Sequence, residues 1–237
     1  MDTKPLAGRR ILVTRPREHA APLARLIEEA GGTPVLFPAI EIEDVPCAVL
    51  ERLAQYDLAV FVSPTAAQRA LARVTAWPAS LAVAAVGAGT RRALENHGMK
   101  NVLAPEGGAD SEALLALLRE VRGKKIVIVR GEGGREVLAE TLKARGAAVD
   151  YAECYRRMRP GSKLKEGEPV DAITVSSAEA LDNLLDMLGE RSRTLPWFVP
   201  HPRVAAHAAA RGLGEVVLAA PSDGEMLERL VAYFGPP

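Results

Sequence analysis

Six short segments rich in Gly, Ser, Thr and Arg carry groups that can bind an anion. Glycine lets the backbone approach a ligand closely, and free N–H groups at the start of a helix attract negative charge. Arginine binds carboxylates through paired hydrogen bonds. These segments together predict a site for a polyanion. They are residues 14–16, 63–65, 86–90, 130–135, 176–177 and 200–203.

The candidate ligand-binding residues in these segments are Arg15, Ser63, Thr65, Gly87, Ala88, Thr90, Arg130, Gly131, Arg135, Ser176, Ser177, His201 and Arg203. Two alternatives stay open. The hydroxyls of Ser63, Thr65 and Ser177 can instead cap the helices that follow them. His201 stands between two prolines, which can stiffen the loop rather than present the imidazole to a ligand.

Tyr155 is the candidate catalytic residue. It lies in an extended segment, 148–157, beside Arg156 and Arg157. The alternation of a strand places Tyr151, Glu153 and Tyr155 on one face. A tyrosine in this position can donate a proton to a ligand. The alternative is a strand tyrosine that packs on a helix.

Several other chemistries are disfavoured by missing motifs. The glycines at 87 and 89 and those at 131, 133 and 134 do not form a dinucleotide fingerprint, and no Gly-Lys-Ser/Thr phosphate loop occurs. The four histidines show no metal-ligand spacing. No Gly-x-Ser-x-Gly elbow is present. These absences disfavour kinases, P-loop ATPases, NAD enzymes, zinc enzymes and acyl transferases.

Composition limits the partners. The 237 residues carry 30 Lys+Arg and 30 Asp+Glu, a formal net charge of zero, which disfavours nucleic acid as a partner. The N-terminus shows no signal-peptide pattern, and no apolar run has the length of a membrane helix. Cys47 and Cys154 suggest neither a disulfide framework nor a metal site. We therefore expect a cytoplasmic protein with no membrane partner.

The elements that must position these residues form an internal repeat. A strand–helix–strand unit begins at residues 10–14 and recurs about 115 residues later, at 125–130. A second unit begins at residues 58–63 and recurs at 172–177, and each copy reaches a short strand near a proline, at 102–105 and 216–221. The order A, B, A′, B′ predicts two α/β domains of about five parallel strands each. The repeat leaves open whether A pairs with B or with B′.

The architecture suggests where the six segments meet. In open parallel sheets, ligands bind beyond the carboxyl ends of the strands. All six segments follow predicted strands, so we expect them at that edge. Two extended segments, 37–43 and 148–157, are where the chain can cross between domains. The polar run 160–169 is expected to be a surface loop.

A set of short signatures in order resembles the uroporphyrinogen-III synthase family over nearly the whole chain. No single signature is specific, but their joint order within a doubled domain is. They are Val-Thr-Arg-Pro at 13–16, Phe-Pro at 37–38, Phe-Val-Ser-Pro-Thr-Ala at 61–66, Ala-Val-Gly-Ala-Gly-Thr at 85–90, Asp-Ser-Glu at 110–112, Arg-Gly at 130–131 with Gly-Arg at 134–135, Cys-Tyr-Arg-Arg at 154–157 and Val-Ser-Ser at 175–177.

The resemblance implies an α/β fold of two flavodoxin-like parallel-sheet lobes with an interleaved chain, joined by a two-stranded connector. Lobe 1 would comprise residues 1–38 and 157–237, and lobe 2 residues 39–156. Unit A would then pair with B′, and B with A′. The two crossing segments would be the connector strands.

The resemblance also implies a reaction in haem and tetrapyrrole biosynthesis. The substrate would be hydroxymethylbilane, a linear tetrapyrrole with eight carboxylates. The enzyme, a cyclising hydro-lyase, would remove the terminal hydroxyl as water, invert ring D through a spiro intermediate and close the macrocycle. No metal or organic cofactor is implied. Tyr155 matches the tyrosine proposed in this family to assist loss of the hydroxyl.

One segment departs from the family pattern. A Gly-Pro-x-Thr motif, mirrored at residues 87–90, is replaced by Pro-His-Pro-Arg at 200–203. The glycine and the hydroxyl are both absent there. His201 and Arg203 can replace backbone donors with charged ones, or the contact can be lost. The ligand set on that side therefore stays open.

Two alternative functions stay open. One is a cytoplasmic two-lobed protein that binds an anionic small molecule without catalysis, and another is a transferase with a nucleotide donor. We expect a monomer, because no contiguous apolar surface stretch stands out. The sequence leaves open a transient contact with the enzyme that produces hydroxymethylbilane.

Overall fold

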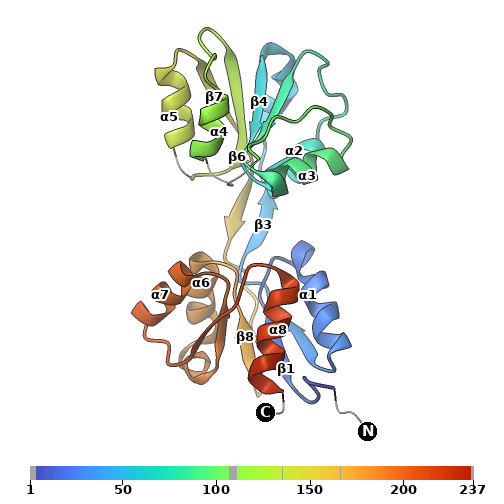
Figure 1. The fold of residues 1–237 in the computed structure, drawn as a ribbon, viewed down its shortest axis with the longest axis vertical. Helices are drawn as coiled ribbons and strands as arrows, with labels where there is room; N and C mark the ends of the chain where they lie inside the picture. Colours follow the sequence, from blue (N-terminus) through green and yellow to red (C-terminus); the bar gives the residue numbers. More distant parts are fainter. Residues whose placement is uncertain (1–3, 107–110, 135, 166, 236–237) are drawn as a thin grey trace. The chain divides into compact units, whose positions relative to one another are not determined.

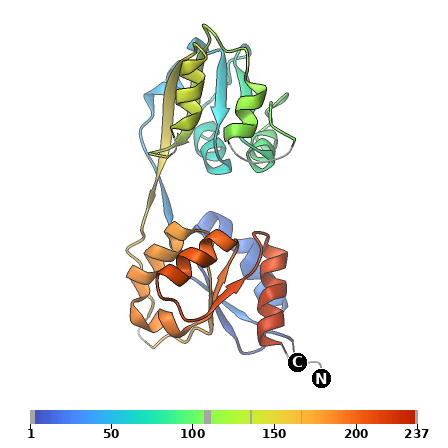
Figure 2. The same ribbon diagram turned by 60° about the vertical axis from the view of Figure 1, so that its left-hand side comes forward.

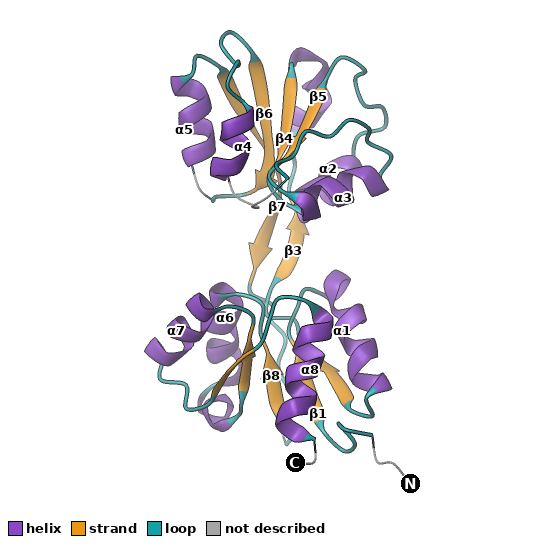
Figure 3. Ribbon diagram, viewed as in Figure 1, coloured by secondary structure: helices purple, strands orange, loops and turns teal. Residues whose placement is uncertain are grey.

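The computed structural model describes residues 4–106, 111–134, 136–165 and 167–235. The chain divides into two compact units. Unit 1 comprises residues 1–41 and 158–237, and unit 2 comprises residues 42–157. Each unit contains a five-stranded sheet with helices on both of its faces (Figures 1 and 3). The chain is thus a mixed α/β protein with two mainly parallel sheets.

The sheet of unit 1 has the strand order β10-β9-β8-β1-β2, and every neighbouring pair is parallel. Strands from the beginning and the end of the chain therefore share one sheet. The strands are β1 (Arg10–Val13), β2 (Thr33–Leu36), β8 (Ala172–Thr174), β9 (Trp197–Val199) and β10 (Val216–Leu218). The helices are α1 (Arg17–Glu29), α6 (Ala178–Leu188), α7 (Pro202–Ala210) and α8 (Asp223–Phe234), with a 3-10 helix η2 (Glu190–Thr194).

Buried apolar side chains join the layers of unit 1. On one face of the sheet, Ile11 and Val13 pack with Leu23 of α1 and with Leu230 of α8. Helices α6 and α7 cover the other face (Figure 2). Strands β1, β8 and β9 are buried along their whole length except at Arg10, and their sequences are mainly apolar. This is expected for a sheet that is covered on both faces.

The sheet of unit 2 has the order β3-β7-β6-β4-β5. The pairs β7–β6, β6–β4 and β4–β5 are parallel. The strands are β3 (Glu41–Asp44), β4 (Leu58–Phe61), β5 (Ala82–Ala85), β6 (Lys125–Gly131) and β7 (Ala148–Met158). The helices are α2 (Pro64–Leu71), α3 (Ala88–Asn96), α4 (Ser111–Leu117) and α5 (Val137–Ala144), with a 3-10 helix η1 (Ala48–Gln55).

Two separate clusters hold unit 2 together. One places α2, α3 and η1 against the sheet face that carries Phe61 and Val129. The other places α4 and α5 against the opposite face, which carries Val60 and Ile128. Alternate residues of β4 and β6 thus serve the two layers, as the pleat of a strand requires.

The strand predicted at residues 102–105 is shorter in the structure. It is reduced to one parallel bridge, between Leu103 and Ala84. Asn101 has a positive φ of 55° just before it, and Pro105 has no N–H to extend the pairing. The equivalent segment in unit 1 forms the regular strand β10.

Candidate functional site

The carboxyl ends of the parallel strands place the predicted segments at one edge of each sheet. In unit 1 these segments follow β1, β8 and β9, and in unit 2 they follow β4, β5 and β6. The helices that come next begin at this edge, so their free N–H groups lie there too. The described residues therefore give each unit its own candidate site.

Sequence features at this edge start the helices. Ser63 Oγ accepts a hydrogen bond from the Ala66 amide at 3.0 Å and caps α2, and Pro64 follows at the first helical position. Ser177 Oγ accepts from the Ala180 amide at 3.1 Å and caps α6. The capping interpretation is therefore confirmed for Ser63 and Ser177. Capping uses only one of the hydroxyl's lone pairs and leaves its donor free.

Tyr155 lies against Ser63 and Gly131 in unit 2. The Tyr155 and Ser63 hydroxyl oxygens are 3.1 Å apart. The Tyr155 side chain is also so close to Gly131 that a Cβ at that position would lie 2.7 Å from two ring carbons. Tyr155 is buried, with 3% of its surface exposed, whereas Ser63 is half-buried. Glycine at position 131 is what leaves room for the tyrosine ring.

The face of β7 that Tyr155 occupies differs from the sequence expectation. Tyr155 packs in the cluster of α2 and α3, together with Ala152 and Cys154, while Tyr151 packs against the α5 side. The reason is a bulge, since Glu153 pairs with Arg130 but Gly131 pairs with Tyr155. The extra residue breaks the alternation. The prediction that Tyr151, Glu153 and Tyr155 share one face is thus wrong.

Arg130 is committed to partners within unit 2. Its Nε and Nη2 donate to Glu153 Oε1 at 3.1 and 3.0 Å, and Nη1 and Nη2 donate to Glu136 Oε1 at 3.0 Å. The guanidinium carbon lies 3.7 Å from the centre of the Tyr151 ring. Burial alone would lower the pKa of Arg130, but its hydrogen bonds to Glu153 and Glu136 raise it. Arg130 thus remains charged, and the carboxylates of Glu136 and Glu153 balance its charge.

The two glutamates extend this cluster to the glycine loop. Glu153 Oε1 also accepts a hydrogen bond from the Gly133 amide at 3.3 Å. Glu136 accepts one from the Tyr151 hydroxyl. This bond and those from Arg130 lower the pKa of Glu136, and burial with the Glu136 bond raises the pKa of Tyr151 to about 12. The cluster therefore fixes the loop after β6.

In unit 1 three predicted residues line one cavity. Arg15, Ser176 and His201 surround a space of about 290 Å³, together with His19 and Pro221. Arg15 Nη1 lies 2.6 Å from Asp223 Oδ1, which orients the guanidinium. Sequence reasoning gave no role to His19. Its position in the first turn of α1, just after the strand end, is the signal that could have found it.

The remaining candidates lie at the starts of helices α2, α3 and α7, except Arg135. Thr65 lies in the first turn of α2, Gly87 is the N-cap of α3, and Ala88 is the first residue of α3. Thr90 is buried. Arg203 is exposed in the first turn of α7 and has no ion-pair partner among the described residues. Arg135 lies outside the described residues.

Within the part of the chain that the structure describes, no three His, Cys, Asp or Glu side chains are grouped as metal ligands. No described helix is long and apolar enough to span a membrane.

These features define the class of the protein, a mixed α/β protein with two mainly parallel sheets. A family model described as uroporphyrinogen-III synthase HemD matches residues 21–228. The chain belongs to the uroporphyrinogen-III synthase family. Its function accordingly lies in tetrapyrrole biosynthesis, and the resemblance found in the sequence is confirmed.

Curated relatives and solved structures carry the same name. The uroporphyrinogen-III synthase of Escherichia coli K12 is 30% identical over 92% of this chain and 98% of its own length. That of Salmonella typhimurium is 32% identical over 81% of this chain and 82% of its own length. The structures from Helicobacter pylori and Thermus thermophilus superpose with TM-scores of 0.67 and 0.61, at 15% and 21% identity. They cover 95% and 94% of this chain, and 99% and 97% of their own, and they support the fold.

The contact between Gly131 and Tyr155 gives a first prediction. Gly131→Ala should destabilise the protein by about 1–3 kcal/mol, because the new methyl group overlaps the tyrosine ring. Urea unfolding would measure this cost. Gly161→Ala is the matched control, since nothing lies within 4 Å of a Cβ there, and it should stay within about 0.5 kcal/mol. Equal costs for the two variants would contradict the close contact.

Proposed function

We propose that this chain converts hydroxymethylbilane to uroporphyrinogen III, with loss of one water and inversion of ring D through a spiro intermediate. The observation that carries the proposal is the hydroxyl pair of Ser63 and Tyr155 at a strand-end edge, in a chain whose family match spans residues 21–228. The reaction makes the chain a cyclising hydro-lyase.

The chemistry needs one proton at the start. The terminal C–O bond of the substrate breaks, the hydroxyl leaves as water, and the electron-rich pyrrole stabilises the carbon left behind. A positioned acid accelerates such a step. The remaining steps form and break carbon–carbon bonds within one flexible molecule, and ring closure releases one proton from the substituted pyrrole carbon, which balances the proton used at the start. The enzyme must fix the geometry of these steps. A sparse set of catalytic side chains suits this reaction.

The hydrogen bonds of Ser63 suggest how the proton is delivered. A serine hydroxyl has one donor and two acceptor sites. Ser63 Oγ accepts from the Ala66 amide and, in our assignment, from the Tyr155 hydroxyl. Its own O–H is then free to donate to the leaving hydroxyl, and Tyr155 replaces that proton. The half-buried Ser63 thus contacts the substrate, and the buried Tyr155 is the proton source.

Substrate carboxylates are proposed to bind at the strand ends of both units. In unit 1 the cavity of Arg15, Ser176 and His201 offers charged and neutral donors. Arg203 is exposed, and it supplies a further cation where the family's glycine and hydroxyl are absent. The further proposed contacts are made by Ser177, Thr65, Gly87, Ala88, Thr90, Gly131 and Arg135.

Arg130 is given a different role from the one expected. All three of its guanidinium nitrogens donate to Glu136 or Glu153. A guanidinium neutralised in this way has little attraction left for a substrate carboxylate. We assign it to holding the loop that carries Gly131 against Tyr155.

The finer architecture is also a proposal. The strand orders β2-β1-β8-β9-β10 and β7-β6-β4-β5 follow the flavodoxin-like pattern, with the bridge at Leu103 beside β5. We propose two such lobes, residues 1–38 with 157–237 and residues 39–156, joined by a two-stranded connector. A monomer and a transient contact with the enzyme that makes the substrate complete the proposal.

The direct test is an isomer assay. Hydroxymethylbilane is generated in situ, the purified protein is added, and the oxidised porphyrins are separated by chromatography. The proposal predicts a dominant type III product, because the substrate alone is expected to close without inversion to type I. Type I alone, at the rate without enzyme and with folded protein, would overturn it and favour a binding protein without catalysis.

Removal of the Tyr155 hydroxyl tests its role. Tyr155→Phe should lower kcat for the type III isomer by about 100-fold or more, as expected for loss of a general acid. Tyr56→Phe in the same unit is the control, since the Tyr56 hydroxyl donates to Asp150 at 2.7 Å, away from the strand ends. Its kcat should change less than about twofold. A loss below about tenfold in Tyr155→Phe would reduce Tyr155 to a positioning role.

A further inference from the structure

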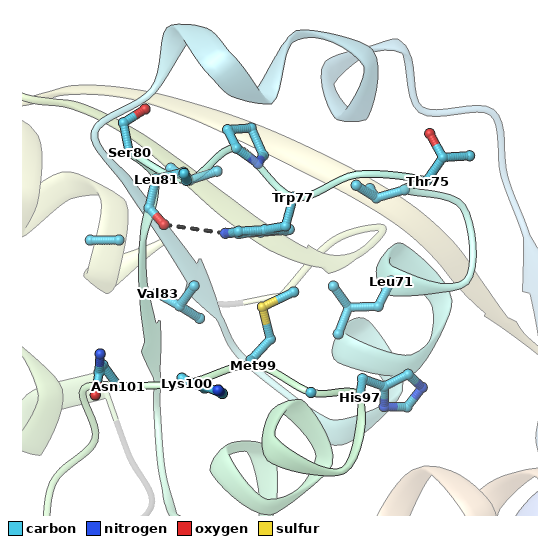
Figure 4. Close-up of a pocket in the computed structure, with 15 residues that line it drawn as sticks. Leu71, Thr75, Trp77, Ser80, Leu81, Val83, His97, Met99, Lys100 and Asn101 are labelled. Atoms are coloured by element: carbon cyan, nitrogen blue, oxygen red, sulfur yellow. Dashed lines mark hydrogen bonds between the residues drawn. The ribbon is translucent and has the colours of Figure 1, made fainter.

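A second cavity lies within unit 2, away from the strand-end site. Its volume is about 730 Å³, and it is lined by residues 71, 74, 75, 77–83 and 97–101 (Figure 4). It includes Ala82 at the amino end of β5, whereas the candidate site follows the carboxyl end. None of the proposed substrate-binding residues lines it. Cavities of roughly 300–1,000 Å³ are typical of small-molecule sites.

The wall of this cavity presents an aromatic ring in a fixed position. The Trp77 indole donates from Nε1 to the Leu81 carbonyl at 3.2 Å. The centre of its ring lies 5.9 Å from the centre of the buried Phe61 ring. In Figure 4, Val83 and Leu71 flank the space between Trp77 and Met99. A flat apolar group can therefore stack on a surface that is already ordered, which limits the entropy lost on binding.

The charge around the cavity has one sign. None of the described lining residues is acidic, while Lys100 and His97 both line it. The Lys100 ammonium has no hydrogen-bond or ion-pair partner among the described residues. His97 donates from Nδ1 to the Ala93 carbonyl at 2.8 Å. An anion would therefore be attracted, whereas a cation would meet no carboxylate among the described lining residues.

We propose that this cavity binds a planar aromatic carboxylate, with the ring system on Trp77 and the carboxylate at Lys100. The apolar wall selects a flat ring, and the ammonium selects a negative charge on it. This proposal does not depend on the proposed reaction. Binding can therefore fail while the isomer assay succeeds, and the reverse.

The two tryptophans of the chain allow a direct test. The Trp197 indole is fully buried in unit 1 and donates to the Ser192 carbonyl at 2.9 Å, so it serves as an internal reference. 2-Naphthoate is titrated into the ¹⁵N-labelled protein while both indole N–H resonances are followed by NMR, with Trp77→Phe for assignment. We expect the Trp77 resonance to shift saturably and that of Trp197 to stay in place.

Two comparisons test the role of the charge. The neutral 2-naphthamide has the same rings and should bind at least about threefold more weakly than 2-naphthoate, because the charge-assisted hydrogen bond is lost. Lys100→Gln should weaken 2-naphthoate binding by about the same factor and leave 2-naphthamide unchanged. Lys163→Gln, an exposed lysine of unit 1, is the matched control and should change neither.

Two results would overturn the proposal. One is no saturable shift of the Trp77 resonance up to the solubility limit of 2-naphthoate. The other is equal affinity for the acid and the amide with no effect of Lys100→Gln, which would show that the cavity takes apolar rings without regard to charge.

Discussion

One extra residue in β7 sets the position of the tyrosine around which the site of unit 2 is built. The pairing of β6 with β7 advances from Arg130–Glu153 to Gly131–Tyr155, so Cys154 is left over as a bulge. The bulge turns Tyr155 onto the sheet face that α2 covers, where the Ser63 cap begins the helix. Without it, alternation would direct the tyrosine toward α5 and away from Ser63. Cys154 itself is buried, which raises its pKa to about 12 and keeps it a thiol.

The charged side chains beside this bulge hold the backbone of the loop after β6 in place. Arg130 joins Glu136 and Glu153, and Glu153 also holds the Gly133 amide. An arginine paired in this way stabilises a loop without attracting ligands. The exposed Arg203 and the backbone amides at the helix starts are the groups that we propose for binding the anionic substrate.

The sequence is informative where local rules act alone. The apolar runs of β4 and β8, the caps at Ser63 and Ser177 and the repeat of strand–helix units all follow from local patterns, and several of the family signatures lie at the same strand ends. The face of Tyr155 could not be predicted, because a bulge depends on pairing with another strand. The pairing of Arg130 depends on Glu136 and Glu153, whose approach the fold creates. The cavity beside Trp77 has no sequence pattern, because it is defined by the space between packed elements.

The central claim is that the Ser63 and Tyr155 hydroxyls form one proton-delivering pair, and a double-mutant cycle in kcat tests it most directly. The cycle compares the unchanged protein with Ser63→Ala, Tyr155→Phe and the double variant. The control Ser177→Ala measures the stability cost of losing an equivalent helix cap, about 1 kcal/mol. If the two hydroxyls act in series, either loss disables the pair, so the double variant should be about as slow as the slower single variant. Losses that multiply would show that the hydroxyls act independently and would contradict the account.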